Sequence, residues 1–139
     1  MGRIIAIDFG AKRIGLAETD PLQIIASALD TVDNKEIFNY LTDYLKREEV
    51  DEIVVGEPKQ LDDTPSESEA SIIPFIEKLK VLFPNIEIKR FDERFTSKMA
   101  FQTMIDSGIG KKARRNKGLI DKISATIILQ SYLDSKESF

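Results

Sequence analysis

The stretch from Arg3 to Asp20 predicts two short buried strands joined by a tight hairpin. One apolar run, Ile4–Ile7, ends in Asp8, and a second run, Ile14–Ala17, follows after a turn that contains a glycine. Short apolar runs bounded by glycine and charge are typical of buried strands, because a helix needs more length. A turn this short rules out a crossover, so the two strands are antiparallel. Asp8 is then expected near the carboxyl end of a central strand.

Strand and helix patterns alternate along the rest of the chain. Apolar runs predict strands over residues 24–32, 52–57 and 86–91. Helical spacing predicts helices that open with capping boxes at residues 33–36 and 66–69, a third over residues 97–107 and a last one over residues 119–133. Pro74 predicts either a kink in the second helix or a start nearer Ser71. This order predicts an α/β fold: a five-stranded mixed sheet, three antiparallel strands extended by two parallel strands, flanked by helices.

Composition limits the chemistry that the chain can perform. Its 139 residues are 42% hydrophobic and 32% charged, which predicts a single globular domain over residues 1–139. The sequence has no cysteine and no histidine. Disulfides, thiol nucleophiles, Ser-His triads and ordinary zinc sites are therefore excluded. No apolar run approaches the ~20 residues of a membrane helix and no signal-peptide pattern is present, so we expect a cytoplasmic protein with no membrane partner.

One basic segment differs from the rest of an acidic chain. Residues 110–118, GKKARRNKG, contain no acidic residue, although the net charge of the whole chain is −4. The segment holds Lys111, Lys112, Arg114, Arg115 and Lys117. A solvated loop is one interpretation. We favour a phosphate-binding segment, because cations packed this closely repel one another unless an anion lies between them. Nucleic acid is then the expected partner.

Carboxylates follow the ends of three predicted strands. The positions are Asp8, Glu57 and the pair Asp92–Glu93, and Asp121 lies in the first turn of the last predicted helix. Each has an ordinary explanation by itself: a turn residue, a surface ion pair, or a charge that complements the helix dipole.

Their convergence is harder to explain by ordinary roles. Carboxylates at neighbouring strand ends repel one another unless divalent cations lie between them, and carboxylate oxygens favour Mg²⁺ or Mn²⁺. Such a cluster suits phosphoryl transfer, in which metal ions activate a water and stabilise the leaving oxygen. Arg13, Arg94 and the basic segment would hold the phosphate backbone.

Four motifs in order make the chain similar to the YqgF/RuvX family of Holliday-junction resolvases and pre-16S rRNA nucleases. They are IDFGAKRIGLAETD, IVVGEP, FDERFTS and the basic segment leading into GLIDKISATIILQSYL. The resemblance implies a ribonuclease-H-like fold and a metal-dependent endonuclease that acts on structured RNA or branched DNA. It implies that Asp8, Glu93 and Asp121 are the catalytic, metal-binding carboxylates, with Asp92 as a secondary candidate. The substrate would be the 5′ end of pre-16S rRNA, or alternatively a Holliday junction.

The chain departs from the family pattern at two places. Glu57 stands where the family more often has an apolar residue, which adds a further candidate metal ligand whose role is open. The loop after Pro58 usually carries a glycine and here reads LDDTPSE.

Two other functions compete with a nuclease. Actin-like kinases open with a similar Asp-x-Gly hairpin, but they bind ATP between two duplicated domains, which 139 residues cannot supply. A non-catalytic nucleic-acid-binding module on the same fold is the other alternative, since a fold does not determine a function. The presence of all three carboxylates favours the enzyme.

Overall fold

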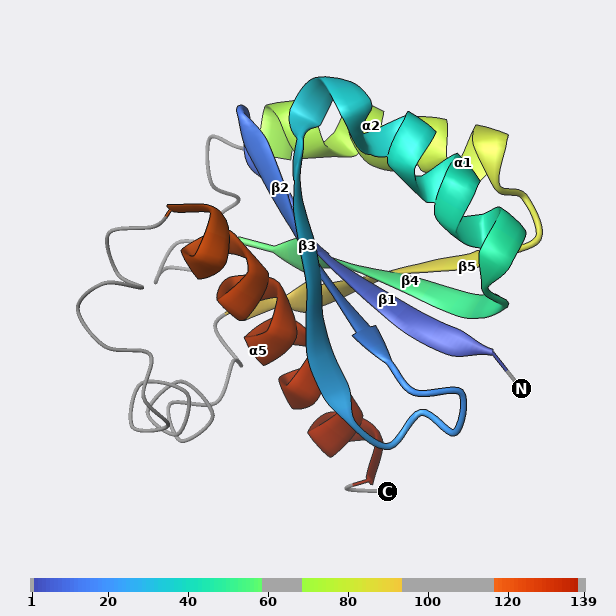
Figure 1. Cartoon of the computed structure of the whole chain (residues 1–139). Helices are drawn as coiled ribbons and strands as arrows, with labels where there is room; N and C mark the ends of the chain where they lie inside the picture. The colour runs from blue at the N-terminus through green and yellow to red at the C-terminus, as the bar shows by residue number, and fades with distance from the viewer. Residues whose placement is uncertain (1, 59–68, 94–116, 138–139) are drawn as a thin grey trace.

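Five strands form one mixed sheet in the order β3-β2-β1-β4-β5. The computed structural model describes residues 2–58, 69–93 and 117–137 (Figure 1). The strands are β1 (Arg3–Asp8), β2 (Arg13–Thr19), β3 (Ala26–Asp33), β4 (Val50–Glu57) and β5 (Glu87–Asp92). β2 pairs antiparallel with both β1 and β3, whereas β4 pairs parallel with both β1 and β5. The predicted combination of an antiparallel hairpin sheet and two parallel strands is confirmed.

Helices cover both faces of this sheet (Figure 1). They are α1 (Ile37–Arg47), α2 (Glu69–Leu82) and α5 (Lys117–Glu137), and a short 3-10 helix, η1 (Asn34–Glu36), precedes α1. Alternation along β1 separates two cores, because successive side chains of a strand point to opposite faces. Ile5 and Ile7 pack in the core with α1 and α2, whereas Ile4 and Ala6 pack in the core with α5. Of the helices in the described ranges, none is long and apolar enough to cross a membrane.

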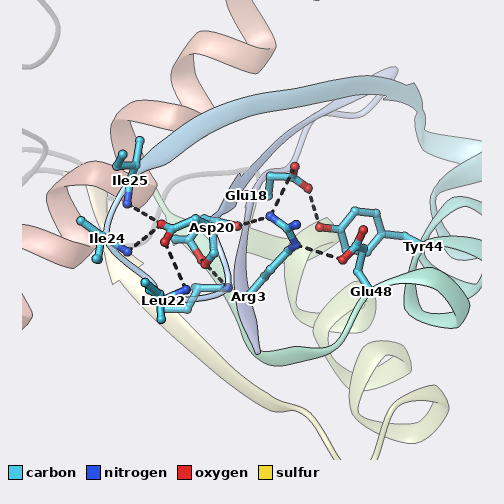
Figure 2. Close-up of polar contacts among 10 residues, drawn as sticks. Arg3, Glu18, Asp20, Leu22, Ile24, Ile25, Tyr44 and Glu48 are labelled. Carbon is cyan, nitrogen blue, oxygen red and sulfur yellow. Dashed lines mark hydrogen bonds and ion pairs between the residues drawn. The ribbon is translucent and has the colours of Figure 1, made fainter. Parts of the chain in front are cut away.

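The third strand begins later than the apolar pattern predicts. Ile24 and Ile25 were expected in the strand, but they are 60% and 61% exposed and precede β3. The carboxylate of Asp20 accepts the backbone N–H groups of Leu22, Ile24 and Ile25 at 3.1, 2.8 and 2.7 Å. These bonds hold a turn in place of strand pairing (Figure 2).

The first predicted capping box does not cap a helix. Neither Asp33 nor Glu36 makes a side-chain capping bond, and the chain passes through η1 before α1 begins. Asn34 binds the β1–β2 turn instead: its backbone N–H donates to the carbonyl of Lys12 at 2.9 Å, and its side-chain amide donates to the carbonyl of Gly10 at 2.7 Å. The residues after β3 therefore hold the hairpin turn that follows Asp8.

Two other helix predictions change at their boundaries. α2 begins at Glu69 and contains Pro74, so the start nearer Ser71 is wrong. α5 begins at Lys117, which places the last two residues of the predicted basic loop in the helix. The predicted helix over residues 97–107 and the second capping box, except its last residue, lie outside the described residues.

Candidate active site

Asp8 ends β1 in the middle of the sheet, between β2 and β4. Its partner across the antiparallel pair is Gly15. Burial, followed by the negative charges of Glu93 and Asp121, raises the pKa of the Asp8 carboxyl to about 7. A carboxyl group that is desolvated and surrounded by like charge is an arrangement typical of functional sites.

Glu93 follows β5 directly and lies over the end of β4. A Cβ atom added at Gly56 would be 3.1 Å from Cδ of Glu93, so the glycine leaves the space that this carboxylate uses. Burial raises the pKa of Glu93; the positive charge of Arg90 opposes this, and the negative charges of Asp92 and Glu69 add to it. The parallel order β1-β4-β5 thus brings two strand-end carboxylates to the same edge of the sheet.

Asp121 reaches the same edge from the first turns of α5. The helix backbone lies against β2, because a Cβ atom at Gly15 would come 2.0 Å from the carbonyl oxygen of Asp121. Arg13 opens β2, and its Nε donates to Oδ2 of Asp121 at 2.9 Å. The structure therefore brings Asp8, Glu93 and Asp121, which we call the acidic cluster, into one electrostatic neighbourhood.

The chemistry of the acidic cluster fits a hard cation, because every candidate donor is a carboxylate oxygen. Among the described residues, no group of three or more aspartate or glutamate side chains is arranged to hold one metal ion. The members of the cluster act on each other's charge without forming a common ligand shell. In this arrangement the carboxylate of Asp121 binds a guanidinium group.

Arg90 organises the neighbouring strand ends and was not singled out from the sequence. Its guanidinium donates to the carbonyls of Val55 and Gly56 at 3.3 and 3.1 Å and binds Glu69 at 2.6 Å. Glu57, one of the additional candidate ligands, forms an ion pair with Arg90 at 3.8 Å. Asp92, the other one, pairs in register with Glu57 across β4 and β5. The only sequence signal for Arg90 is its place in a strand next to the FDERFTS motif.

The predicted phosphate-binding cations divide into two groups. Arg13 belongs to the part of the chain that the structure describes; its side chain is 37% exposed and lies at the acidic cluster. Arg94, Lys111, Lys112, Arg114 and Arg115 lie outside the described residues, and Lys117 is the first residue of α5. The structure thus places one predicted phosphate-binding side chain beside the carboxylates.

Comparisons with known proteins agree with this architecture. The structure of T. thermophilus RuvC in complex with a Holliday junction substrate superposes with a TM-score of 0.58 at 12% identity, over 99% of this chain and 96% of that one. The chain thus has the ribonuclease-H-like fold of RuvC, which confirms the predicted fold class. A family model described as "RuvX: Holliday junction resolvase" matches residues 2–135.

Bacterial relatives match over nearly their full length. A Flavobacterium johnsoniae protein named "Putative pre-16S rRNA nuclease" is 54% identical over 136 residues, which are 98% of this chain and 99% of that protein. A protein of the same name from Christiangramia forsetii is 55% identical over 133 residues, 96% of this chain and 98% of that protein. The chain belongs to the RuvX family of nucleases.

Proposed function

We propose that this protein is a metal-dependent endonuclease of structured nucleic acid, and that its substrate is the 5′ region of pre-16S rRNA. The observation that carries the proposal is the convergence of Asp8, Glu93 and Asp121 at one sheet edge, where burial and then the two neighbouring negative charges raise the pKa of Asp8 to about 7. Such an accumulation of negative charge costs folding free energy, and a function that uses the carboxylates together explains why it is kept.

Asp8, Glu93 and Asp121 would hold Mg²⁺ or Mn²⁺, with Asp92 and Glu57 as further candidate ligands. When bound, such an ion would activate water and stabilise the leaving oxygen of a phosphodiester. The chain's own cations have a separate task. Arg13 lies at the cluster, and Arg94 and the basic segment of residues 110–118 would bind the phosphate backbone and orient it toward the carboxylates.

The names of the relatives support ribosomal RNA as the substrate, and the family description supports a four-way DNA junction as the alternative. Cleavage of a pre-16S rRNA fragment and of a synthetic junction should be compared at equal concentrations, with and without Mn²⁺. Unbranched duplexes of the same composition serve as substrate controls. We expect cut RNA in the presence of metal, no cleavage by Asp8→Asn, and full cleavage by Asp43→Asn, which removes an exposed carboxylate on α1. Cleavage of the junction alone would select the alternative substrate.

The basic segment gives a second test that needs no cleavage. Replacing Lys111, Lys112, Arg114 and Arg115 with alanine should weaken binding of RNA and DNA and flatten its salt dependence, because each lost phosphate contact removes roughly one unit of slope. The matched control replaces four exposed cations elsewhere, Lys35, Lys46, Arg47 and Lys80, and changes the net charge equally. If both variants lost the same nucleic-acid affinity, the effect would come from net charge, and a binding role of the segment would be contradicted.

A non-catalytic module remains the competing function. Nucleic-acid binding without cleavage, in a protein whose Asp8→Asn variant binds as the parent does, would favour it. We further propose that residues 1–139 act as one domain in the cytoplasm, where precursor rRNA is present.

A further inference from the structure

We propose that Arg13 positions the carboxylate of Asp121, holding it away from the rest of the acidic cluster until a phosphate group of the nucleic acid takes the guanidinium. This inference rests on the proposed nuclease function. It makes Arg13 a positioning residue that couples the arrival of substrate to completion of the acidic cluster. This role is more than binding of the phosphate backbone, because the guanidinium of Arg13 binds either the Asp121 carboxylate or a phosphate group, but not both.

The backbone on the Asp121 side of the pair has little freedom to move. The carbonyl of Asp121 lies against β2 where Gly15 has no side chain, and a Cβ atom there would be 2.0 Å away. Ala125, one turn further along α5, is fully buried in the core beneath the helix. Any change in the position of the Asp121 carboxylate must therefore come from rotation of its side chain.

The backbone on the Arg13 side is held as firmly. Arg13 pairs in register with Asp33 of β3, and the turn before it is bound at two carbonyls by Asn34. The turn is also tight, since a Cβ atom at Gly10 would lie 2.3 Å from the carbonyl oxygen of Arg13. With both backbones fixed, the ion pair is a contact between two side chains that can be broken without moving β2 or α5.

Solvent can reach both partners of this ion pair. The side chains of Arg13 and Asp121 are 37% and 25% exposed. A phosphate can therefore approach the guanidinium, which binds phosphate oxygens through paired donors. A half-exposed ion pair of this kind contributes little net free energy, so exchanging it for a phosphate contact costs little.

Once released from Arg13, the Asp121 carboxylate can turn toward the other two carboxylates of the acidic cluster. The negative charge of Asp121 already acts on Asp8, yet the described acidic side chains do not form a three-carboxylate metal site as they stand. Removing Arg13 would leave the Asp121 carboxylate without this partner, beside the two other carboxylates. Phosphate binding at Arg13 and cation binding at the cluster are then positively coupled, and the coupling must be reciprocal.

Calorimetric titration with Mn²⁺ in the absence of nucleic acid tests the inference on the full chain. We expect Arg13→Ala to bind Mn²⁺ roughly 3- to 10-fold more tightly than the parent, because Asp121 no longer has to leave an arginine. The same variant should bind nucleic acid more weakly, with a salt slope lower by about one. Arg13→Lys should restore much of the nucleic-acid affinity. Arg47→Ala, which removes an exposed arginine on α1, should change neither affinity.

A double-mutant cycle separates positioning from a general effect of positive charge. If Arg13 acts through Asp121, then adding Arg13→Ala to Asp121→Asn should leave Mn²⁺ affinity unchanged. An equal gain in both backgrounds would mean that Arg13 only repels cations, and it would overturn the proposal. Unchanged or weaker Mn²⁺ binding by Arg13→Ala would overturn it too. Arg13→Met, which keeps a long side chain without the charge or a hydrogen-bond donor, carries the same expectations should the alanine variant not fold.

The proposed function can fail independently of this inference. A parent protein that binds Mn²⁺ and nucleic acid with the expected coupling but cuts neither RNA nor DNA would refute the nuclease and leave the role of Arg13 intact. A parent that cuts, with an Arg13→Ala variant whose Mn²⁺ affinity does not rise, would refute only the role of Arg13.

Discussion

The two ends of the β1–β2 hairpin carry charge in opposite ways. At the end where β1 begins, Arg3 binds Glu48 at 3.1 Å and the carbonyl of Thr19 at 2.9 Å, and the hydroxyl of Tyr44 donates to Glu18 (Figure 2). At the end where β1 stops, Asp8 lies in the field of Glu93 and Asp121. At the first end each charged group named lies beside an opposite charge or a hydrogen-bond partner. At the second end Asp8 lies beside two like charges, although Asp121 itself forms an ion pair with Arg13.

The pKa shifts follow the same division. Hydrogen bonds from backbone N–H groups, that of Ile25 foremost, lower the pKa of Asp20, so this turn favours the charged carboxylate. Burial and like charge raise the pKa values of Asp8 and Glu93, so their neighbourhood opposes the charged form. One end of the hairpin therefore stabilises the fold, and the other stores unfavourable electrostatic free energy, as functional sites often do.

The largest effect is expected from Asp8→Asn, which removes the central charge of the acidic cluster. Cleavage should fall roughly 10³-fold or more, because several kcal/mol of transition-state stabilisation depend on a correctly held metal ion. Without metal, the same variant should be more stable than the parent by about 1–3 kcal/mol at pH 8, since it no longer buries a charged carboxylate among like charges.

Chemical denaturation in a chelator measures the stability, and single-turnover cleavage measures the activity. Asp20→Asn is the matched control at the other end of the hairpin, where the carboxylate is well hydrogen-bonded. It should lower stability and leave cleavage as it is. Loss of stability in both variants would show that the two ends do not differ.

Gly15→Ala should have the next largest effect, on the attachment of α5 to the sheet. The new methyl group would meet the backbone of Asp121, which cannot yield as a flexible side chain does, so we expect a loss of about 1–3 kcal/mol or more. Gly56→Ala is its counterpart, because there the methyl group meets the side-chain ends of Ile128 and Glu93. That variant should keep more of its stability but lose cleavage through displacement of Glu93. Equal unfolding midpoints would contradict this distinction.

The sequence predicts the sheet well because its information is local. Apolar runs set the strands, and a turn of a few residues makes β1 and β2 antiparallel. Asp8 lies in the middle of the sheet because β4 pairs with the other side of β1. The boundary errors have local causes of a different kind. Asp20 competes for backbone N–H groups before β3, and Asn34 bonds to the carbonyls of the preceding turn in place of a capping bond. The spacing of apolar residues carries no information about the hydrogen bonds of Asp20 or of Asn34.

The candidate site is less predictable, because its contacts join distant segments. Arg13 and Asp121 are 108 residues apart, and no pattern near either one indicates the ion pair. The close approach of α5 to Gly15 is equally non-local, as is the position of Glu93 over Gly56. The carboxylates could be named from their places after apolar runs and from the family resemblance. Their catalytic role stays a prediction.

The pH dependence of stability tests whether the pKa of Asp8 is raised. The expected change in stability is smaller than those above, but its sign is fixed. The pKa of Asp8 is about 7 in the folded protein and about 3.8 when unfolded. Because the folded pKa is the higher one, the contribution of this group to stability is fully present below about pH 4 and is lost as the pH rises through about 7. In a chelator, the melting temperature of Asp8→Asn should therefore exceed that of the parent by a margin that grows from pH 5 to pH 8. A constant margin would mean that the pKa of Asp8 in the folded protein lies below about 5, and would contradict the raised value.

The smallest effect on cleavage should come from substitution of Glu52. This residue lies on β4 and contacts the C-terminal part of α5, far along the helix from Asp121. Tyr132 donates to Glu52 at 2.6 Å, and the ammonium groups of Lys136 and Lys89 each lie 3.0 Å from its carboxylate. Burial raises the pKa of Glu52, but these three hydrogen bonds outweigh it and lower the pKa. The stabilisation is therefore present at neutral pH and is lost as the pH falls through the lowered value.

Glu52→Gln keeps the shape and removes the charge, so we expect a loss of about 1 kcal/mol at pH 7, because both lysines are partly solvated and tolerate the change. The loss should shrink toward acidic pH, where the parent carboxylate is protonated as well. Cleavage should stay within about twofold of the parent, since the N-terminal part of α5 is held separately through Gly15. A large loss of cleavage with little loss of stability would show that this end of α5 also positions Asp121, and that the paired charges serve the site as well as the fold.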